Sequence, residues 1–299
     1  MTIRFGVSPI AWINDDMPEL GGDTPLESVL RDIQEVGFVG VELGGKFPRD
    51  ADTLRGLLGR HDLALVGGWY SSSLLLRDSD AEIDALRSHL QLLQSLDSKV
   101  FIIAETSNAI HGERAVPLAD SPALGEEEWK RFGERLTGVA DFVEGQGLRL
   151  AYHHHLGTVV ESEQELEQFL ASTGDSVGLT IDTGHAALGG IDAVSVLERA
   201  PQRIAHVHCK DVRRTVFESI LTEDRSFLDG VLCGMFTVPG DGDLDFQPLF
   251  GALSEMNYSG WVIVEAEQDP AIADPRAFAQ IGLGTLRHHA RLARLEEAA

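Results

Sequence analysis

The stretch Gly178-Leu-Thr-Ile-Asp-Thr-Gly-His185 is a short apolar run that ends in an aspartate and a histidine. Seven similar runs occur along the chain, and several are apolar at consecutive positions, which is typical of strands covered on both faces. The eight predicted strands are Arg4–Val7, Gly40–Leu43, Leu63–Gly67, Val100–Ala104, Leu148–Tyr152, Gly178–Ile181, Ile204–Val207 and Trp261–Val264.

Helical patterns separate the predicted strands. Leu26, Val29, Leu30 and Ile33 follow helical spacing after Asp23-Thr24-Pro25, which we interpret as a cap followed by a proline at the helix start. A β–α unit repeated eight times predicts a (β/α)8 TIM barrel. A doubly wound sheet shares the alternation, but no Gly-x-Gly-x-x-Gly follows the first strand.

We expect one α/β domain over residues 1–299, because no linker or shift in composition divides the chain. The segment Val212–Asp243, between the seventh and eighth strands, is too long for an ordinary connection. In a barrel it would lie at the carboxyl ends of the strands, where it could act as a lid. Within it, Pro239–Asp243 is interpreted as a mobile turn.

The charge balance narrows the class of partner. The chain has 48 acidic and 24 basic residues, a net charge of −24, which disfavours nucleic acid and anionic membranes. It has no apolar run of membrane-spanning length. Cys209 and Cys233 cannot form a disulfide framework, and no signal peptide is visible at the start. We therefore expect a cytoplasmic protein.

Ionisable residues stand directly after most of the predicted strands, where a barrel would bring them to one mouth. They are Glu42 and Lys46, Glu105, His153 to His155, Asp182 and His185, His206, His208 and Lys210, and Glu265 and Glu267. Imidazole and carboxylate together suit Mn²⁺, Co²⁺, Fe²⁺ or Zn²⁺. We expect Asp182, His208 and Glu265 to act together, with His206 packing deeper. His111, His288 and His289 are interpreted as ordinary structural residues.

Several segments give the chain a specific resemblance. Asp-Thr-Gly-His, His-Val-His-Cys-Lys-Asp and Val-Glu at the last three strands resemble the sugar isomerase/epimerase-like, or xylose-isomerase-like, barrels. An ordered set more narrowly resembles the inosose dehydratases. Its members are Trp12-Ile-Asn-Asp-Asp-Met-Pro-Glu-Leu-Gly-Gly, Tyr152-His-His-His-Leu-Gly-Thr, His206-Val-His-Cys-Lys-Asp-Val-Arg, Phe227-Leu-Asp-Gly-Val-Leu, Phe236-Thr-Val-Pro-Gly-Asp-Gly-Asp-Leu-Asp-Phe and Val264-Glu-Ala-Glu-Gln-Asp-Pro.

The resemblance implies a ligand set for a divalent metal. Asp182, His208 and Glu265 match the metal ligands of the superfamily, and His185 matches a residue that usually contacts substrate. The superfamily places a glutamate ligand where this chain has His153. Either His153 replaces that ligand, or another of the three histidines or a water molecule does.

The activity implied is loss of water from 2-keto-myo-inositol (scyllo-inosose), through an enediolate, to a trihydroxycyclohexane-1,2-dione in inositol catabolism. Mn²⁺ or Co²⁺ is the implied cofactor. Related enzymes are also associated with glutathione, which no residue here explains. A base must take the α-proton and an acid must protonate the departing hydroxyl. The candidates for these duties are His154 or His155 and Glu42 or Lys46, while His185, Lys210 and Arg213 are candidates to hold substrate hydroxyls.

Three alternatives stay open at this point. A sugar or ketose isomerase or epimerase would share the metal but return the proton to carbon. A DNA-repair endonuclease on the same barrel is disfavoured by the net charge of −24. A non-catalytic sugar-binding barrel would leave the metal ligands without a purpose. Apolar helix faces would permit a homo-oligomer.

Overall fold

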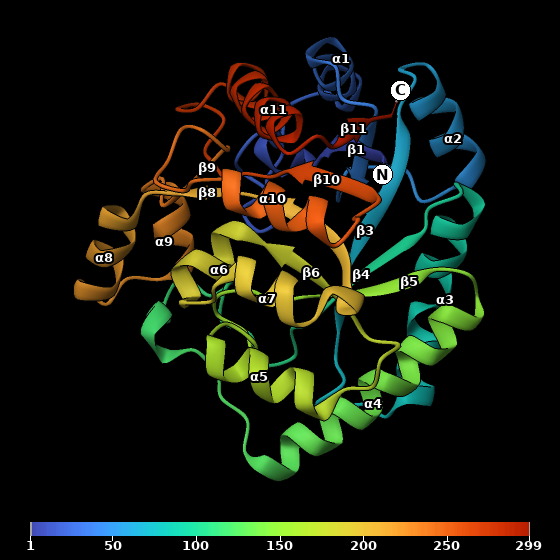
Figure 1. Cartoon of the computed structure of the whole chain (residues 1–299), viewed down its shortest axis with the longest axis vertical. Helices are drawn as coiled ribbons and strands as arrows, with labels where there is room; N and C mark the ends of the chain where they lie inside the picture. Colours follow the sequence, from blue (N-terminus) through green and yellow to red (C-terminus); the bar gives the residue numbers. More distant parts are fainter. Residues whose placement is uncertain (1, 299) are drawn as a thin grey trace.

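Eight parallel strands close into a barrel in the computed structural model, which describes residues 2–298 (Figure 1). Neighbouring strands follow the order of the chain, and β1 closes the ring by pairing with β10, from Ile3 opposite Gly260 to Val7 opposite Val264. The barrel strands are β1 (Thr2–Val7), β2 (Gly40–Leu43), β3 (Ala64–Ser72), β4 (Val100–Glu105), β5 (Arg149–His153), β6 (Gly178–Asp182), β7 (Ile204–Cys209) and β10 (Gly260–Val264). All eight predicted strands and the predicted barrel are confirmed.

Helices surround the barrel on its outer side (Figure 1). They are α1 (Leu26–Val36), α2 (Ala51–Gly59), α3 (Ser79–Ser95), α4 (Glu126–Gly145), α5 (Glu163–Ser172), α6 (Thr183–Gly189), α7 (Ala193–Arg199), α8 (Arg214–Thr222), α9 (Phe227–Leu232), α10 (Gln247–Glu255) and α11 (Pro275–Leu292). Three short 3-10 helices are η1 (Pro9–Ala11), η2 (Leu118–Asp120) and η3 (Pro201–Arg203). A last short strand, β11 (Glu296–Glu297), pairs with β1.

The first helix shows how the predicted signals work. Val29, Leu30 and Ile33 are fully buried on its inner face, as the spacing predicts. The helix ends at Gly37, whose φ of 102° suits a residue without a side chain. Its start differs from the prediction, because Pro25 itself occupies the N-cap position and no side chain caps the helix.

The long segment between the seventh and eighth strands is folded. It contains α8 and α9, and its β8 (Asp211–Val212) pairs antiparallel with β9 (Phe236–Thr237). Its apolar side chains form a cluster with Met17, Leu118 and Leu156, which holds the segment against the barrel. The segment is therefore packed onto the barrel rather than extended over it as an open loop.

The turn that the sequence analysis interpreted as mobile is anchored. The Asp211 carboxylate accepts hydrogen bonds from the backbone N–H groups of Gly240, Gly242 and Leu244, at 2.9 to 3.1 Å. Gly242 lies so close that a Cβ atom there would meet Asp211 Oδ1 at 2.4 Å. The interpretation of Pro239–Asp243 as mobile is therefore wrong, because a buried carboxylate fixes its backbone.

None of the helices within residues 2–298 is both long enough and apolar enough to cross a lipid bilayer.

Candidate active site

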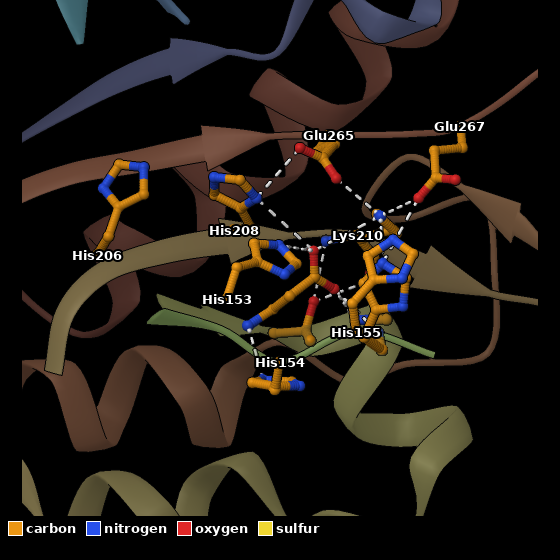
Figure 2. Close-up of polar contacts among 12 residues, drawn as sticks. His153, His154, His155, His206, His208, Lys210, Glu265 and Glu267 are labelled. Atoms are coloured by element: carbon orange, nitrogen blue, oxygen red, sulfur yellow. Dashed lines mark hydrogen bonds and ion pairs between the residues drawn. The ribbon is translucent and has the colours of Figure 1, made fainter. Parts of the chain in front are cut away.

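Four buried side chains converge at the carboxyl ends of the strands. His153 ends β5, Asp182 ends β6, His208 lies on β7 and Glu265 directly follows β10. One ligand atom from each lies within 4.8 Å of every other, so the group could hold a metal ion. Figure 2 shows His153 and His208 side by side, with Glu265 above His208. The barrel thus brings together the four residues that the sequence analysis named as metal ligands.

The distances fit a divalent cation. Asp182 Oδ2 lies 3.6 Å from His153 Nε2 and 3.7 Å from His208 Nδ1, and Glu265 Oε2 lies 3.1 Å from His208 Nδ1. Donor atoms bound about 2.1 Å from one ion lie about 3.4 Å apart in a tetrahedron. Asp182 Oδ2 is buried and has no hydrogen-bond partner among the described residues. A bound cation would satisfy this orphaned oxygen.

The two carboxylate oxygens of Asp182 have different roles, one in capping a helix and one in the candidate metal site. Its Oδ1 accepts the N–H groups of Gly184 and His185, both at 2.9 Å, and so caps the N-terminus of α6. The cap fixes the carboxylate and leaves Oδ2 facing the other ligands.

Glu42 lies next to the candidate ligand His208 and lines the cavity over the site. Its Oε1 accepts hydrogen bonds from His206 Nε2 at 2.8 Å and from His208 Nε2 at 2.9 Å. Burial favours the neutral carboxyl, but the two imidazoles outweigh burial and lower the pKa of Glu42 to about 2. The same carboxylate, with Glu265, raises the pKa of the buried His208 well above its ordinary value. Glu42 is therefore an ionised carboxylate held by two histidines, which argues against its predicted role as the acid.

The three consecutive histidines point to different places. His153 faces the other ligands, while His154 faces the opposite side of the strand, where its Nε2 accepts the N–H of Asp182 at 3.3 Å. Burial and the neighbouring His153 lower the pKa of His154 to about 3. His155 lines the cavity over the candidate ligands and His154 does not, so of these two acid–base candidates the geometry favours His155.

Lys210 is a buried cation beside the candidate metal site. Its Nζ lies 2.7 Å from Glu265 Oε1, 2.6 Å from Glu267 Oε1 and 3.0 Å from His185 Nε2 (Figure 2). Burial alone would lower its pKa, but Asp182 and Glu265 outweigh burial and raise it. Neither Lys210 nor His185 lines the cavity described next. Both side chains instead contact Glu267, which lines that cavity, and their predicted contacts with substrate stay predictions.

A cavity of about 590 Å³ lies over the candidate metal site. His153, His208 and Glu265 line it together with Trp69, His155 and Glu267. Residues of the β1–α1 and β2–α2 connections also line it, namely Asn14, Asp15, Asp16, Lys46 and Arg49. Lys46 directs its Nζ to the carbonyl oxygens of Gly22 and Thr24.

The structure bears on two further predictions about side chains. Arg213 bonds Gly234, Thr237 and Asp241 within the packed segment and does not line the cavity, so the structure does not support its predicted role with substrate. His111 does line the cavity, with its ring centroid 5.0 Å from that of His155, although the sequence analysis treated it as structural.

The sequence analysis missed two kinds of cavity residue. Trp69 was missed because β3 continues to Ser72, beyond the predicted end at Gly67. Asn14, Asp15 and Asp16 were quoted only for the resemblance. The sequence did hold a signal for them. They lie in the connection that follows the first strand, and polar residues in such a connection lie at the catalytic face of a barrel.

Residues 30–288 match the family model described as xylose isomerase-like TIM barrel. The chain belongs to this family. Within the family, it is 39% identical over 279 residues to an inosose dehydratase of Clostridium perfringens, covering 93% of this chain and 94% of that protein. An inosose dehydratase of Geobacillus thermodenitrificans is 40% identical with the same coverage. The resemblance to the inosose dehydratases is confirmed.

The chain is also similar to a protein of rhizopine catabolism and to a solved epimerase structure. The rhizopine catabolism protein MocC of Rhizobium meliloti is 44% identical over all 299 residues and 90% of its own length. The solved structure of L-ribulose 3-epimerase superposes with a TM-score of 0.69 at 16% identity, covering 98% of this chain and 96% of that one. At that identity the superposition shows the shared xylose isomerase-like barrel alone.

Proposed function

We propose that this protein is a metal-dependent inosose dehydratase, a hydro-lyase that converts scyllo-inosose to a trihydroxycyclohexane-1,2-dione. The observation that supports this proposal most strongly is the buried group of His153, Asp182, His208 and Glu265 beneath the cavity. It occurs in a chain that is 39% to 40% identical to inosose dehydratases over 93% of its length. A cavity of about 590 Å³ offers ample room for a six-carbon polyol ketone.

His153, Asp182, His208 and Glu265 would hold the metal, and their mixed nitrogen and oxygen donors suit Mn²⁺ or Co²⁺. When bound, such an ion supplies a Lewis acid that draws charge onto the ketone oxygen and acidifies the neighbouring C–H. The identity of the metal, the role of glutathione, the cytoplasmic location and the homo-oligomer stay predictions.

His155 is the residue best placed to take the α-proton. Its Nδ1 lies 2.7 Å from the carbonyl oxygen of Leu156, so Nδ1 carries the hydrogen and donates it. That tautomer leaves the Nε2 lone pair free to accept a proton. Burial, and then the neighbouring His185, lower the pKa of His155 well below its ordinary value, which keeps the ring neutral before reaction.

The cavity walls would hold the polyol ring. Trp69 lies edge-on to the rings of His153 and His155, at centroid distances of 5.3 and 5.9 Å, and adds an apolar surface beside the candidate base. Lys46 and Arg49 supply cationic donors from the β2–α2 connection. This mixture of an apolar wall and a few polar groups is usual for small-molecule sites.

The test is turnover of scyllo-inosose by chelator-stripped protein, with and without added Mn²⁺ or Co²⁺. The expected product is an enol that absorbs in the ultraviolet and has lost the mass of one water molecule. The same assay on Asp182→Asn, which removes a charged ligand, should give no product. If wild-type protein forms no product with any divalent metal, the dehydratase assignment is wrong and ketose epimerisation becomes the reaction to test.

A second candidate is a dehydration within rhizopine catabolism. It is supported by the 44% identity to MocC, which exceeds the 39% to 40% identity to the two inosose dehydratases. The kinetics on scyllo-inosose separate the two candidates. A kcat/KM of at least about 10⁴ M⁻¹ s⁻¹, the ordinary enzyme range, supports scyllo-inosose as substrate, and a much lower value indicates another polyol ketone.

A further inference from the structure

The connection between β1 and α1 places one unengaged carboxyl in the cavity. Asn14 Oδ1 accepts the N–H groups of Asp16 at 2.9 Å and Met17 at 2.8 Å, which fixes the turn. The Asp15 carboxylate accepts the N–H of Gly45, with its nearer oxygen at 2.9 Å. The Asp16 carboxyl lines the cavity and has no hydrogen bond or ion pair with any residue from 2 to 298.

The two acid candidates that the sequence analysis named, Glu42 and Lys46, are engaged. Glu42 accepts from His206 and His208, and Lys46 donates to two backbone carbonyls. Their hydrogen bonds make both residues less suited than an unengaged carboxyl to give a proton to the departing hydroxyl. Asp16 is the carboxyl on the β1–α1 connection that is both in the cavity and free to meet a substrate.

The surroundings of Asp16 favour its protonated form. Asp16 is an exposed residue that lines the cavity. Desolvation by the surrounding protein, and the negative charges of Glu267, Asp15 and Glu265, raise the pKa of Asp16 to about 7, while Lys210 opposes the shift. Near neutral pH the carboxyl can therefore both carry and release a proton.

We propose that Asp16 is the general acid that protonates the departing β-hydroxyl, an inference that rests on the proposed dehydratase function. Asn14 supports the same subsite, because its Nδ2 is buried, lacks a hydrogen-bond partner among the described residues and belongs to a cavity-lining side chain. This amide would donate to a neighbouring hydroxyl of the polyol and so orient the leaving group.

The step balances without any further reactant. His155 Nε2 takes the α-proton, and the C–H electron pair becomes the enolate. Asp16 gives its proton to the β-oxygen as the C–O bond breaks, so that water leaves and the enolate electrons form the new C=C bond. Asp16 is left as a carboxylate and His155 as an imidazolium, and proton exchange with solvent restores both.

The first experiment compares Asp16→Asn with wild type in D₂O. Loss of a general acid typically slows a reaction by about 10²- to 10⁴-fold, so we expect dehydration to fall by that factor. Removal of the α-proton does not need Asp16, so the variant should still incorporate deuterium at the α-carbon of scyllo-inosose and should bind metal as wild type does. If Asp16→Asn dehydrates at the wild-type rate, or loses deuterium incorporation together with dehydration, the proposal is overturned.

A second substrate makes the test independent of folding. In a scyllo-inosose analogue whose β-hydroxyl is replaced by fluorine, fluoride leaves without needing a proton. Asp16→Asn should therefore release fluoride at close to the wild-type rate, and slow fluoride release would overturn the acid role. Asn14→Asp, which keeps the oxygen that fixes the turn but removes the free donor, should raise KM. An unchanged KM would remove Asn14 from the subsite.

The matched control lies on the same connection. Glu19 carries a carboxyl that pairs with Arg114 at 3.3 Å and does not line the cavity, so Glu19→Gln should dehydrate at the wild-type rate. Failure of the proposed function is distinguishable, because wild-type protein would then neither exchange the α-hydrogen nor dehydrate scyllo-inosose.

Discussion

Glu42 Oε1 lies 2.9 Å from His208 Nε2 and thereby turns the other ring nitrogen of His208 toward Asp182 and Glu265. A carboxylate that receives the remote N–H of a metal-binding histidine fixes its tautomer and raises the basicity of the ligand nitrogen. Here the same oxygen also receives His206 Nε2, at 2.8 Å. Glu42 therefore belongs to the support of the candidate metal site.

This relationship predicts the behaviour of Glu42→Gln. We expect metal affinity to fall about 10- to 100-fold, because the neutral amide orients and polarises His208 less well. Turnover at saturating metal should approach wild type. A competition titration against a chelator measures the affinity. Glu27→Gln alters a matched carboxylate–imidazole pair on the surface, with His61 at 2.9 Å, and should change neither quantity. Turnover that stays low at saturating metal would instead support the acid–base role predicted from the sequence.

Because the two oxygens of Asp182 have different roles, two substitutions of this residue should differ in stability. Asp182→Asn keeps an oxygen to cap α6 and loses the charge, whereas Asp182→Ala loses both. Both variants should lose metal-dependent turnover. In the presence of chelator, the free energy of unfolding of Asp182→Ala should be lower than that of Asp182→Asn by about 0.5–2 kcal/mol, the usual value of an N-cap. Denaturant unfolding measures the difference, and equal stabilities would contradict the cap.

The strands of the barrel, and the residues at their carboxyl ends, could be predicted from the sequence. Eight apolar runs predicted a parallel barrel, and a barrel gathers strand ends, so Asp182, His208 and Glu265 could be placed together before any coordinates. Alternation along β7 puts His206 and His208 on the same face, where both contact Glu42, and sets the residue between them on the other face. The same pattern, continued past the end of β5, separates His154 from His153 and His155. Applied there, it would have favoured His155 over His154, whose side chain does not line the cavity.

The rest depended on connections whose paths the sequence does not specify. Arg213 lies three residues after Lys210, but the β8–β9 pair directs it to Asp241 within the packed segment. Asp16 lies about 250 residues from Glu265 in the chain, and only closure of the barrel between β1 and β10 brings their connections to one cavity. Periodicity locates elements, whereas such long-range contacts require the folded backbone.

Lys210 provides a prediction about stability. Its ammonium is fully buried between Glu265 and Glu267, so Lys210→Met would leave buried carboxylates without their cation. Breaking a buried ion pair in this way costs about 3–5 kcal/mol of unfolding free energy. Denaturant unfolding in chelator should show that loss, while Lys46→Met, at an exposed position, should change stability by less than about 1 kcal/mol. A Lys210→Met protein as stable as wild type would contradict this account of the site.

The pH dependence of dehydration tests the protonation state of Asp16. The raised pKa of about 7 means that the carboxyl is protonated below that pH and ionised above it. Since the acid must carry its proton, kcat should fall about tenfold per pH unit once the pH exceeds the pKa of Asp16 in the metal-loaded protein. A profile from about pH 5.5 to about pH 9 at saturating metal measures this limb. The limb should disappear in Asp16→Asn, whose residual rate has no carboxyl to titrate, and should persist in Glu19→Gln. An alkaline limb that survives in Asp16→Asn would assign the titrating acid to another group in the cavity.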